Sequence, residues 1–153
     1  MIRPLEDGEI DALAAELAAL PLLGRYGRTP ALLAGDLRSA AARGDGLLVH
    51  ADGGPADGLA WFLPAGTFGL GGYLRLLAVS AAAQSRGAGA ALLAAFEAAV
   101  ADRSRHAFLL VSDFNRPAQA FYRRRGYAEV GRLPALVVPD IDELIYWKRL
   151  TGP

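Results

Sequence analysis

The amino-acid sequence predicts an α/β (α+β) protein built on a mixed, mostly antiparallel sheet of six to seven strands with helices on both faces. Three apolar segments joined by glycine-containing turns, residues 46–51, 58–64 and 73–80, are typical of an antiparallel meander. A helical segment over residues 87–101 then separates the strand 73–80 from the apolar strand 107–112. That arrangement indicates a central βαβ unit whose two strands run parallel.

Two helices are expected before the meander. The first covers residues 5–20, where apolar side chains recur at spacings of three and four: Ile10, Leu13, Leu17 and Leu20. Prolines and glycines between positions 21 and 30 then predict a break in the chain. The second helix is expected over residues 31–42 and ends near Gly44.

The helix of the βαβ unit should bury one stripe of side chains, made of Leu92, Leu93, Phe96 and Val100, while Glu97 and Asp102 face water. A short helix follows the unit, with Pro117 in its first turn and Gly126 at its end. Residues 127–133 and 144–148 are the last two expected strands. With a strand ahead of the first helix, the predicted order of elements is β-α-α-β-β-β-α-β-α-β-β.

Composition limits the classes of function. A chain of 153 residues with 53% hydrophobic and 21% charged residues fits one folded domain, residues 1–153. Its formal net charge of +0 provides no overall field that would attract nucleic acid or an anionic membrane, so neither is an expected partner. The absence of cysteine excludes disulfides, thiolate metal sites and a cysteine nucleophile. With no signal peptide and no long apolar run, the expected location is the cytoplasm.

The loop Gln84-Ser85-Arg86-Gly87-Ala88-Gly89, between a strand and a helix, is a candidate anion site. The N-terminus of a helix carries free N–H groups, and glycines allow a pyrophosphate to approach the backbone closely. Two nucleotide motifs fit this loop less well. A P-loop needs a Gly-Lys-Ser/Thr sequence, which is lacking here, and in a dinucleotide fingerprint Leu92 would occupy the third glycine position. In that second motif the glycines also follow the strand almost directly, whereas here four residues separate Ser80 from Ser85.

The loop resembles the acetyl-CoA signature of the GNAT superfamily of N-acetyltransferases, Q/R-x-x-G-x-G/A. A second segment, from Asn115 to Tyr127, resembles the family pattern N-x-x-A-x-x-F-Y-x-x-x-G-Y, so the similarity spans Leu74 to Gly131. The resemblance implies a GNAT-like fold, with acetyl-CoA as acyl donor and the pyrophosphate held by N–H groups from Ser85 to Ala90. No metal is expected, because the histidines have no spacing that supports a metal site. Ser85 stands where many members have glycine, a change that is tolerable if its φ stays below zero.

The resemblance also implies the residues that bind the donor: Leu77, Ala78, Val79, Gln84, Ser85, Arg86, Gly87, Ala88, Gly89, Ala90, Asn115, Ala118, Phe121 and Tyr122. At spacings of three and four, Asn115, Ala118 and Tyr122 share one face of a helix. Tyr122 is the expected catalytic residue, because its hydroxyl can protonate the departing thiolate. Asn115 is also expected to cap the helix.

The acceptor is expected to be an amine, on a small molecule or at a peptide N-terminus. Tyr26, Trp61 and Asp113 are the candidates for binding it. The general base stays open, because the strand 73–80 contains no acid; Asp113, His50, His106 and a chain of waters are the alternatives. A sensor that binds CoA without turnover is the alternative function. The sequence leaves the oligomeric state open, with a homodimer as one option.

Overall fold

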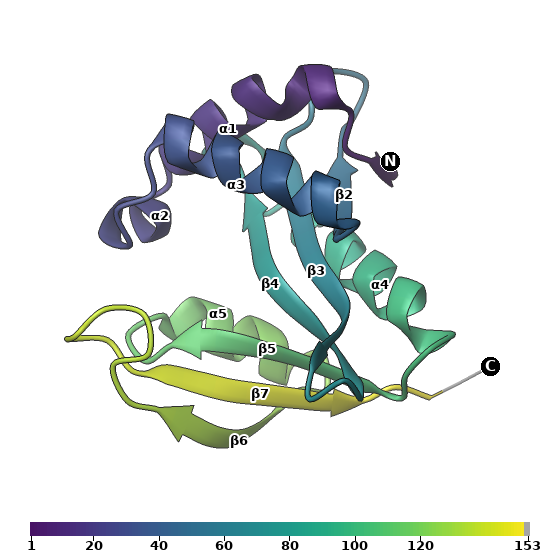
Figure 1. Ribbon diagram of the computed structural model, residues 1–153, viewed down its shortest axis with the longest axis vertical. Helices are drawn as coiled ribbons and strands as arrows, with labels where there is room; N and C mark the ends of the chain where they lie inside the picture. Colours follow the sequence, from purple (N-terminus) through teal and green to yellow (C-terminus); the bar gives the residue numbers. More distant parts are fainter. Residues whose placement is uncertain (152–153) are drawn as a thin grey trace.

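A seven-stranded sheet forms the centre of the structure, in the order β1-β2-β3-β4-β5-β7-β6 (Figure 1). The structure is a computed structural model that describes residues 1–151. Neighbouring strands are antiparallel except β4 and β5, which run parallel. The strands are β1 Ile2–Pro4, β2 Gly46–His50, β3 Gly58–Thr67, β4 Gly71–Val79, β5 His106–Ser112, β6 Ala128–Leu133 and β7 Glu143–Arg149. This topology confirms the predicted mixed sheet with a central parallel pair.

Helices cover both faces of the sheet, as the sequence predicts (Figure 1). The helices are η1 Asp7–Glu9, α1 Ile10–Ala18, α2 Pro21–Arg25, α3 Pro30–Arg43, η2 Ala81–Ala83, α4 Ala88–Ala101 and α5 Arg116–Arg123. Side chains of β3 alternate between two cores because successive residues of a strand point to opposite faces. Leu59 and Trp61 pack with α1, α2 and α3, whereas Ala60 and Phe62 pack with α4. Burial of each such large apolar side chain contributes about 1.5–3 kcal/mol.

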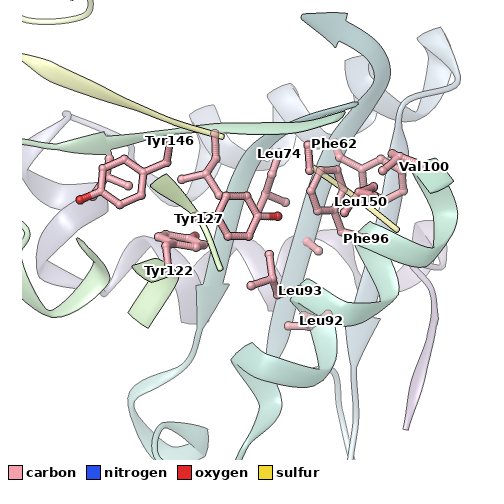
Figure 2. Packing of buried hydrophobic residues seen from close by; sticks show 14 of the residues in the cluster. Phe62, Leu74, Leu92, Leu93, Phe96, Val100, Tyr122, Tyr127, Tyr146 and Leu150 are labelled. Carbon is pink, nitrogen blue, oxygen red and sulfur yellow. The ribbon is translucent and has the colours of Figure 1, made fainter. Parts of the chain in front are cut away.

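The core beneath α4 and α5 is partly aromatic. Figure 2 shows Tyr122, Tyr127 and Tyr146 at one end of this cluster and Phe62, Phe96 and Val100 at the other. The predicted stripe of α4 is buried throughout, with Leu92, Leu93, Phe96 and Val100 between 0% and 1% exposed. This packing anchors α5, the helix that carries Tyr122, against the sheet.

Local signals in the sequence explain the bounds of α3. The Thr29 side chain accepts a hydrogen bond from the Leu32 N–H at 3.2 Å, and Pro30 occupies the first turn, where its missing N–H would have had no partner. Gly44 ends the helix in the left-handed conformation, at φ 80°. The predicted helix 31–42 therefore differs from α3 by only one residue at each end.

Three expectations about local structure were wrong. The segment expected as a break contains the short helix α2, because Pro21 is at a favourable first-turn position and Leu23 is buried. The first α-helix begins at Ile10 after a 3₁₀ turn. Glu97, expected to face water, accepts hydrogen bonds from the Tyr127 hydroxyl at 3.0 Å and from Lys148 at 2.9 and 3.0 Å. A charged residue on the core side of α4 is stable there because both partners reach it.

The helices were compared with the length and apolar character of a membrane span. Across residues 1–151, none combines the length and the apolar character needed to span a bilayer.

Candidate active site

The sheet opens between its two parallel strands. In the β3–β4 ladder Phe62 is opposite Leu74 and Trp61 is opposite Leu76, so Arg75 is an extra residue, a β-bulge in β4. Pairing between β4 and β5 stops at the same point, with Leu74 opposite Leu109. From there the two strands diverge (Figure 1). The bulge thus ends the parallel ladder and leaves one edge of β4, from Arg75 to Val79, without a neighbouring strand.

A cavity of about 400 Å³ lies at this opening. Its walls come from both faces of the sheet, because α2 and α3 contribute from one face and α5 from the other. Most of the lining is apolar, including Leu22, Leu33, Leu76, Leu77, Leu110 and Val137. The cavity is therefore lined from both faces of the sheet.

The loop after β4 presents a row of free N–H groups. None of the backbone N–H groups from Ser85 to Ala90 has a hydrogen-bond partner among residues 1–151; the first to be bonded is Ala91, to the Gly87 carbonyl at 3.0 Å. Gly87 has φ 85°, and a Cβ at this position would meet no atom within 4 Å. Open space beside free N–H groups at the start of a 14-residue helix is suited to an anion.

Ser85 differs from the expectation for this loop. Its φ is 65°, in the left-handed region, where a side chain is strained, rather than below zero as the sequence interpretation required. The side chain is exposed and its hydroxyl makes no hydrogen bond among the described residues. The loop conformation therefore favours glycine at position 85, and serine is accommodated there at some cost in stability.

Two contacts attach the loop to its surroundings. The Gln84 side chain donates a hydrogen bond to the Val79 carbonyl at 3.1 Å, which joins the loop to the end of β4. Gly89, in the first turn of α4, lies against Phe121, since a Cβ there would be 3.6 Å from the ring. Arg86 is exposed and has no ion-pair partner among residues 1–151. The loop, the end of β4 and Phe121 of α5 are therefore adjacent.

Helix α5 presents the predicted face to the cavity. Asn115 caps it, accepting a hydrogen bond from the Ala118 N–H at 3.3 Å, as expected. Asn115, Ala118 and Tyr122 all line the cavity. Gln119, which is buried, holds the helix to β5 by donating to the Ser112 and Asp113 carbonyls at 3.2 and 3.0 Å. Sequence spacing was sufficient to predict this shared face.

Tyr122 combines a buried ring with a hydroxyl that can reach the cavity. Its ring packs edge-on against Phe121, with a centroid distance of 5.1 Å. It packs in the same way against Tyr127 and Tyr146, with centroids 5.7 and 6.4 Å away (Figure 2). The hydroxyl has no partner among the described residues and is not among their fully enclosed polar atoms. Burial raises the pKa of Tyr122 above its ordinary value, and the charge of Arg125 lowers it in part. Tyr122 is therefore protonated at neutral pH.

Glu143, the first residue of β7, was missed from the sequence. Its side chain lines the cavity and is 5% exposed. The Tyr26 hydroxyl donates a hydrogen bond to Glu143 Oε1, and the Ser112 hydroxyl, 2.5 Å from the Tyr26 oxygen, donates to Tyr26 in turn. Burial is the main cause that raises the pKa of the Glu143 carboxyl, and the Asp113 charge adds to it. The only signal in the sequence is an acid at the start of an apolar strand.

The other candidate bases lie elsewhere. His50 Nδ1 is 2.6 Å from Asp57 at the end of β2, and His106 stacks on Trp147 at the opposite end of β5 from Ser112. Asp113 does not line the cavity; its carboxylate accepts from the Asp142 N–H at 3.4 Å. The described residues form no group of three or more metal-ligating acids or histidines.

The two aromatic candidates for the acceptor site do line the cavity. Tyr26 caps the end of α2 and reaches Glu143 across the opening. Trp61 is buried; its indole N–H donates to Asp45 at 2.9 Å, and the Arg75 guanidinium lies 4.6 Å from its ring centroid. The structure therefore brings Tyr26 and Trp61 to one cavity and keeps Asp113 outside it.

Comparison with known proteins identifies the family. The sequence model of the acetyltransferase (GNAT) family matches residues 23–127, while no curated protein matches the chain. Similar solved structures include ribosomal-protein-alanine N-acetyltransferase from Brucella melitensis, at 22% identity and TM-score 0.79 over 98% of this chain and 99% of that one. A GNAT-family acetyltransferase from Bacillus cereus, at 14% identity, has TM-score 0.80 over 99% and 97%.

An aminoglycoside 6′-N-acetyltransferase solved with coenzyme A, at 17% identity, has TM-score 0.80 over 100% of this chain and 98% of that one. These likenesses establish the fold, and the family match covers more than half of the sequence. With its parallel strands parted over a cavity and its loop of free N–H groups, this chain belongs to the GNAT family of acetyltransferases.

Proposed function

We propose that the chain is a single-domain N-acetyltransferase that transfers the acetyl group of acetyl-CoA directly to an amine. One observation carries the proposal: the cavity at the opening between β4 and β5 is lined by Tyr122 from one face of the sheet and by Tyr26 and Glu143 at its other side. The acetyl group of the donor and the amine of the acceptor can therefore meet in this cavity. A sensor that binds only CoA would have no need of the part of the cavity lined by Tyr26 and Glu143.

The donor-binding residues fit a pyrophosphate and an extended arm. The free N–H groups from Ser85 to Ala90 can donate to the phosphates, and exposed Arg86 adds a positive charge beside them. The free edge of β4, including Leu77 and Val79, can pair with an amide-bearing chain as another strand would. Asn115 keeps its amide NH₂ available, because only its oxygen is used in the cap. Bound at this place, acetyl-CoA supplies an acetyl group activated as a thioester.

Tyr122 is proposed as the general acid. Its pKa is raised by burial, so the hydroxyl holds its proton at neutral pH until a thiolate forms beside it. Ala118, one turn before Tyr122 on the same face, leaves room for the donor. Phe121 supports this arrangement from behind, between α5 and the start of α4.

Two measurements test the function. Acetyl-CoA should raise the melting temperature, and the rise should continue with the logarithm of its concentration above Kd, whereas NAD and ATP at equal concentration should not raise it. Release of free CoA thiol should then depend on an added amine and yield one acetylated amine per thiol. Stabilisation by NAD alone, or thiol release that no amine increases, would contradict the proposal.

A further inference from the structure

We infer that Glu143 is the site where the acceptor amine binds and loses its proton, and that this acceptor carries one positive charge and an apolar body. The inference rests on the proposed acetyl transfer and deepens it by naming a base and a class of substrate.

One oxygen of the Glu143 carboxylate is free of protein partners. Tyr26 occupies Oε1, whereas Oε2 has no hydrogen-bond partner among residues 1–151 and is not one of their fully enclosed polar atoms. The side chain nevertheless lines the cavity and is 5% exposed. Burying a carboxylate with one oxygen that has no hydrogen-bond partner costs folding free energy, unless a ligand donates a hydrogen bond to that oxygen. An ammonium group would do so with a charge-assisted hydrogen bond.

Few charged side chains surround the cavity. Four charged side chains line it: Arg28, Asp36, Arg75 and Glu143. Arg28 and Asp36 pair with each other and cancel. Arg75 has no carboxylate partner among the described residues and lies over the ring of Trp61. The lining therefore offers a single carboxylate for a cation, together with an uncompensated guanidinium that repels a second positive charge on the acceptor.

Tyr73 indicates that the charges of Arg75 and Glu143 both act within the same part of the cavity. The pKa of this cavity-lining tyrosine is raised mainly by burial, while the charge of Arg75 lowers it and that of Glu143 raises it. Both charges therefore lie within electrostatic range of one hydroxyl. The remaining wall is formed by leucines and by Val137, which suits an aliphatic or aromatic body on the acceptor.

The proton balance of the reaction follows from these contacts. Glu143 Oε2 takes one proton from the acceptor ammonium, which leaves a neutral amine with a free electron pair. That pair forms the bond to the acetyl carbonyl carbon, the carbon–sulfur bond breaks, and its electrons leave with the sulfur. Tyr122 gives its proton to the sulfur. The second amine proton returns through solvent to the tyrosinate, and Glu143 releases its proton to water.

Other groups around Glu143 set the pH dependence. Tyr26 faces it from the end of α2, Ser112 and Asp113 lie at the end of β5, and Tyr73 lies on β4. Arg28, Asp36 and Arg75 line the same cavity. Tyr26 itself has a pKa raised to about 12, chiefly by burial, so it remains a donor throughout the working range. Tyr26 acts as a positioning residue, because it fixes Oε1 and leaves Oε2 for the amine.

Three acceptors that share the same α-amine test the substrate class: leucinamide, glycinamide and lysinamide. Leucinamide adds an apolar body, and lysinamide adds a second positive charge. The kcat/KM for leucinamide should exceed the values for both others at least tenfold. Replacing Arg75 with Glu should lower the KM for lysinamide. The ratio of kcat/KM for leucinamide to kcat/KM for lysinamide should therefore fall at least fivefold. Equal or faster turnover of lysinamide by the unaltered protein would overturn the inference.

Glu143→Gln tests the base, with Glu16→Gln as a control because Glu16 is an exposed acid on α1. We expect kcat for leucinamide to fall by about 10²-fold or more at pH 7 in the first variant, and to be unchanged in the second. The deficit should shrink toward pH 9, where an α-amine of pKa about 8 deprotonates without help. An unchanged kcat at pH 7, or a deficit independent of pH, would remove Glu143 from proton transfer.

Calorimetry with acetyl-CoA keeps the two proposals apart. Glu143→Gln should bind acetyl-CoA as tightly as the unaltered protein, since Glu143 lies neither in the loop of free N–H groups nor on the free edge of β4. Failure of the unaltered protein to bind acetyl-CoA would refute the proposed function itself. Binding without turnover of any of the three amides would refute only the acceptor class.

Discussion

Tyr26 and Glu143, 117 positions apart in the chain, are joined by a hydrogen bond from the tyrosine hydroxyl to the carboxylate. Tyr26 ends α2 on one side of the opening, and Glu143 begins β7 on the other. Both side chains line the cavity, and the Ser112 hydroxyl joins their contact from the end of β5. A polar group buried in an apolar cavity is placed by partners such as these.

Glu143→Gln should not destabilise the protein at neutral pH. Burial raises the pKa of Glu143 in the folded state, so the folded form holds the proton at pH values where the unfolded form has lost it. The stability of the unaltered protein therefore falls as pH rises from the ordinary carboxyl pKa through the raised one. Urea unfolding should show the variant gaining free energy of unfolding relative to the parent across that window, with no gain below it. A loss that grows with pH would contradict the burial argument.

Tyr122→Phe should lower kcat by about 10²-fold with little change in the KM for acetyl-CoA, because the lost proton acts only in the transition state. The hydroxyl has no protein partner among residues 1–151, so stability should be nearly unchanged. Tyr127→Phe is the matched control, since its hydroxyl donates to Glu97. It should cost about 1 kcal/mol of stability and leave kcat as it was. A mere twofold fall in kcat for Tyr122→Phe, with chemistry rate-limiting, would exclude it as the acid.

Gly87→Val should weaken acetyl-CoA binding at least about tenfold, some 1.4 kcal/mol, because the side chain fills open space beside the free N–H groups. It also strains the backbone, whose φ is 85°. Gly53→Val separates the two effects: Gly53 has φ 73°, likewise meets nothing within 4 Å, and does not lie in the loop after β4. Calorimetry and melting should show both variants less stable, and only Gly87→Val impaired in binding. Equal affinities would show that the glycine serves the turn alone.

Ser85→Gly should stabilise the protein by about 0.5–1 kcal/mol. Glycine removes the strain of a side chain in the left-handed region, which costs about 1–2 kcal/mol. Glycine also loses more backbone entropy on folding, which offsets about 0.5–1 kcal/mol of that gain. Acetyl-CoA affinity should be retained, since the backbone N–H stays in place. Ser85→Ala keeps the strain and should match the parent in urea unfolding. Destabilisation by glycine would mean that the serine side chain makes a contact of its own.

Short-range patterns were sufficient to predict much of this protein. Helical spacing identified the buried stripe of α4, and the i, i+3, i+7 arrangement placed Asn115, Ala118 and Tyr122 on one face of α5. The strand–loop–helix sequence around Gln84 to Gly89 predicted where free N–H groups would gather. Each depends on backbone geometry within a few residues, which the sequence encodes directly. The role of every one of these residues remains a prediction.

Tertiary structure decided the acceptor side of the site. The bulge at Arg75 changes which face of β4 each side chain occupies, and it ends the parallel ladder. No local sequence pattern predicts this bulge. Asp113 and Glu143 are both acids at strand ends, yet only Glu143 lines the cavity. The difference arises because β7 pairs antiparallel with β5, so the start of β7 meets Ser112 at the end of β5. Pairing between distant segments depends on the packing of the whole chain. For that reason the sequence alone predicted the loop after β4 and the shared face of α5, but not the place of Glu143 in the cavity.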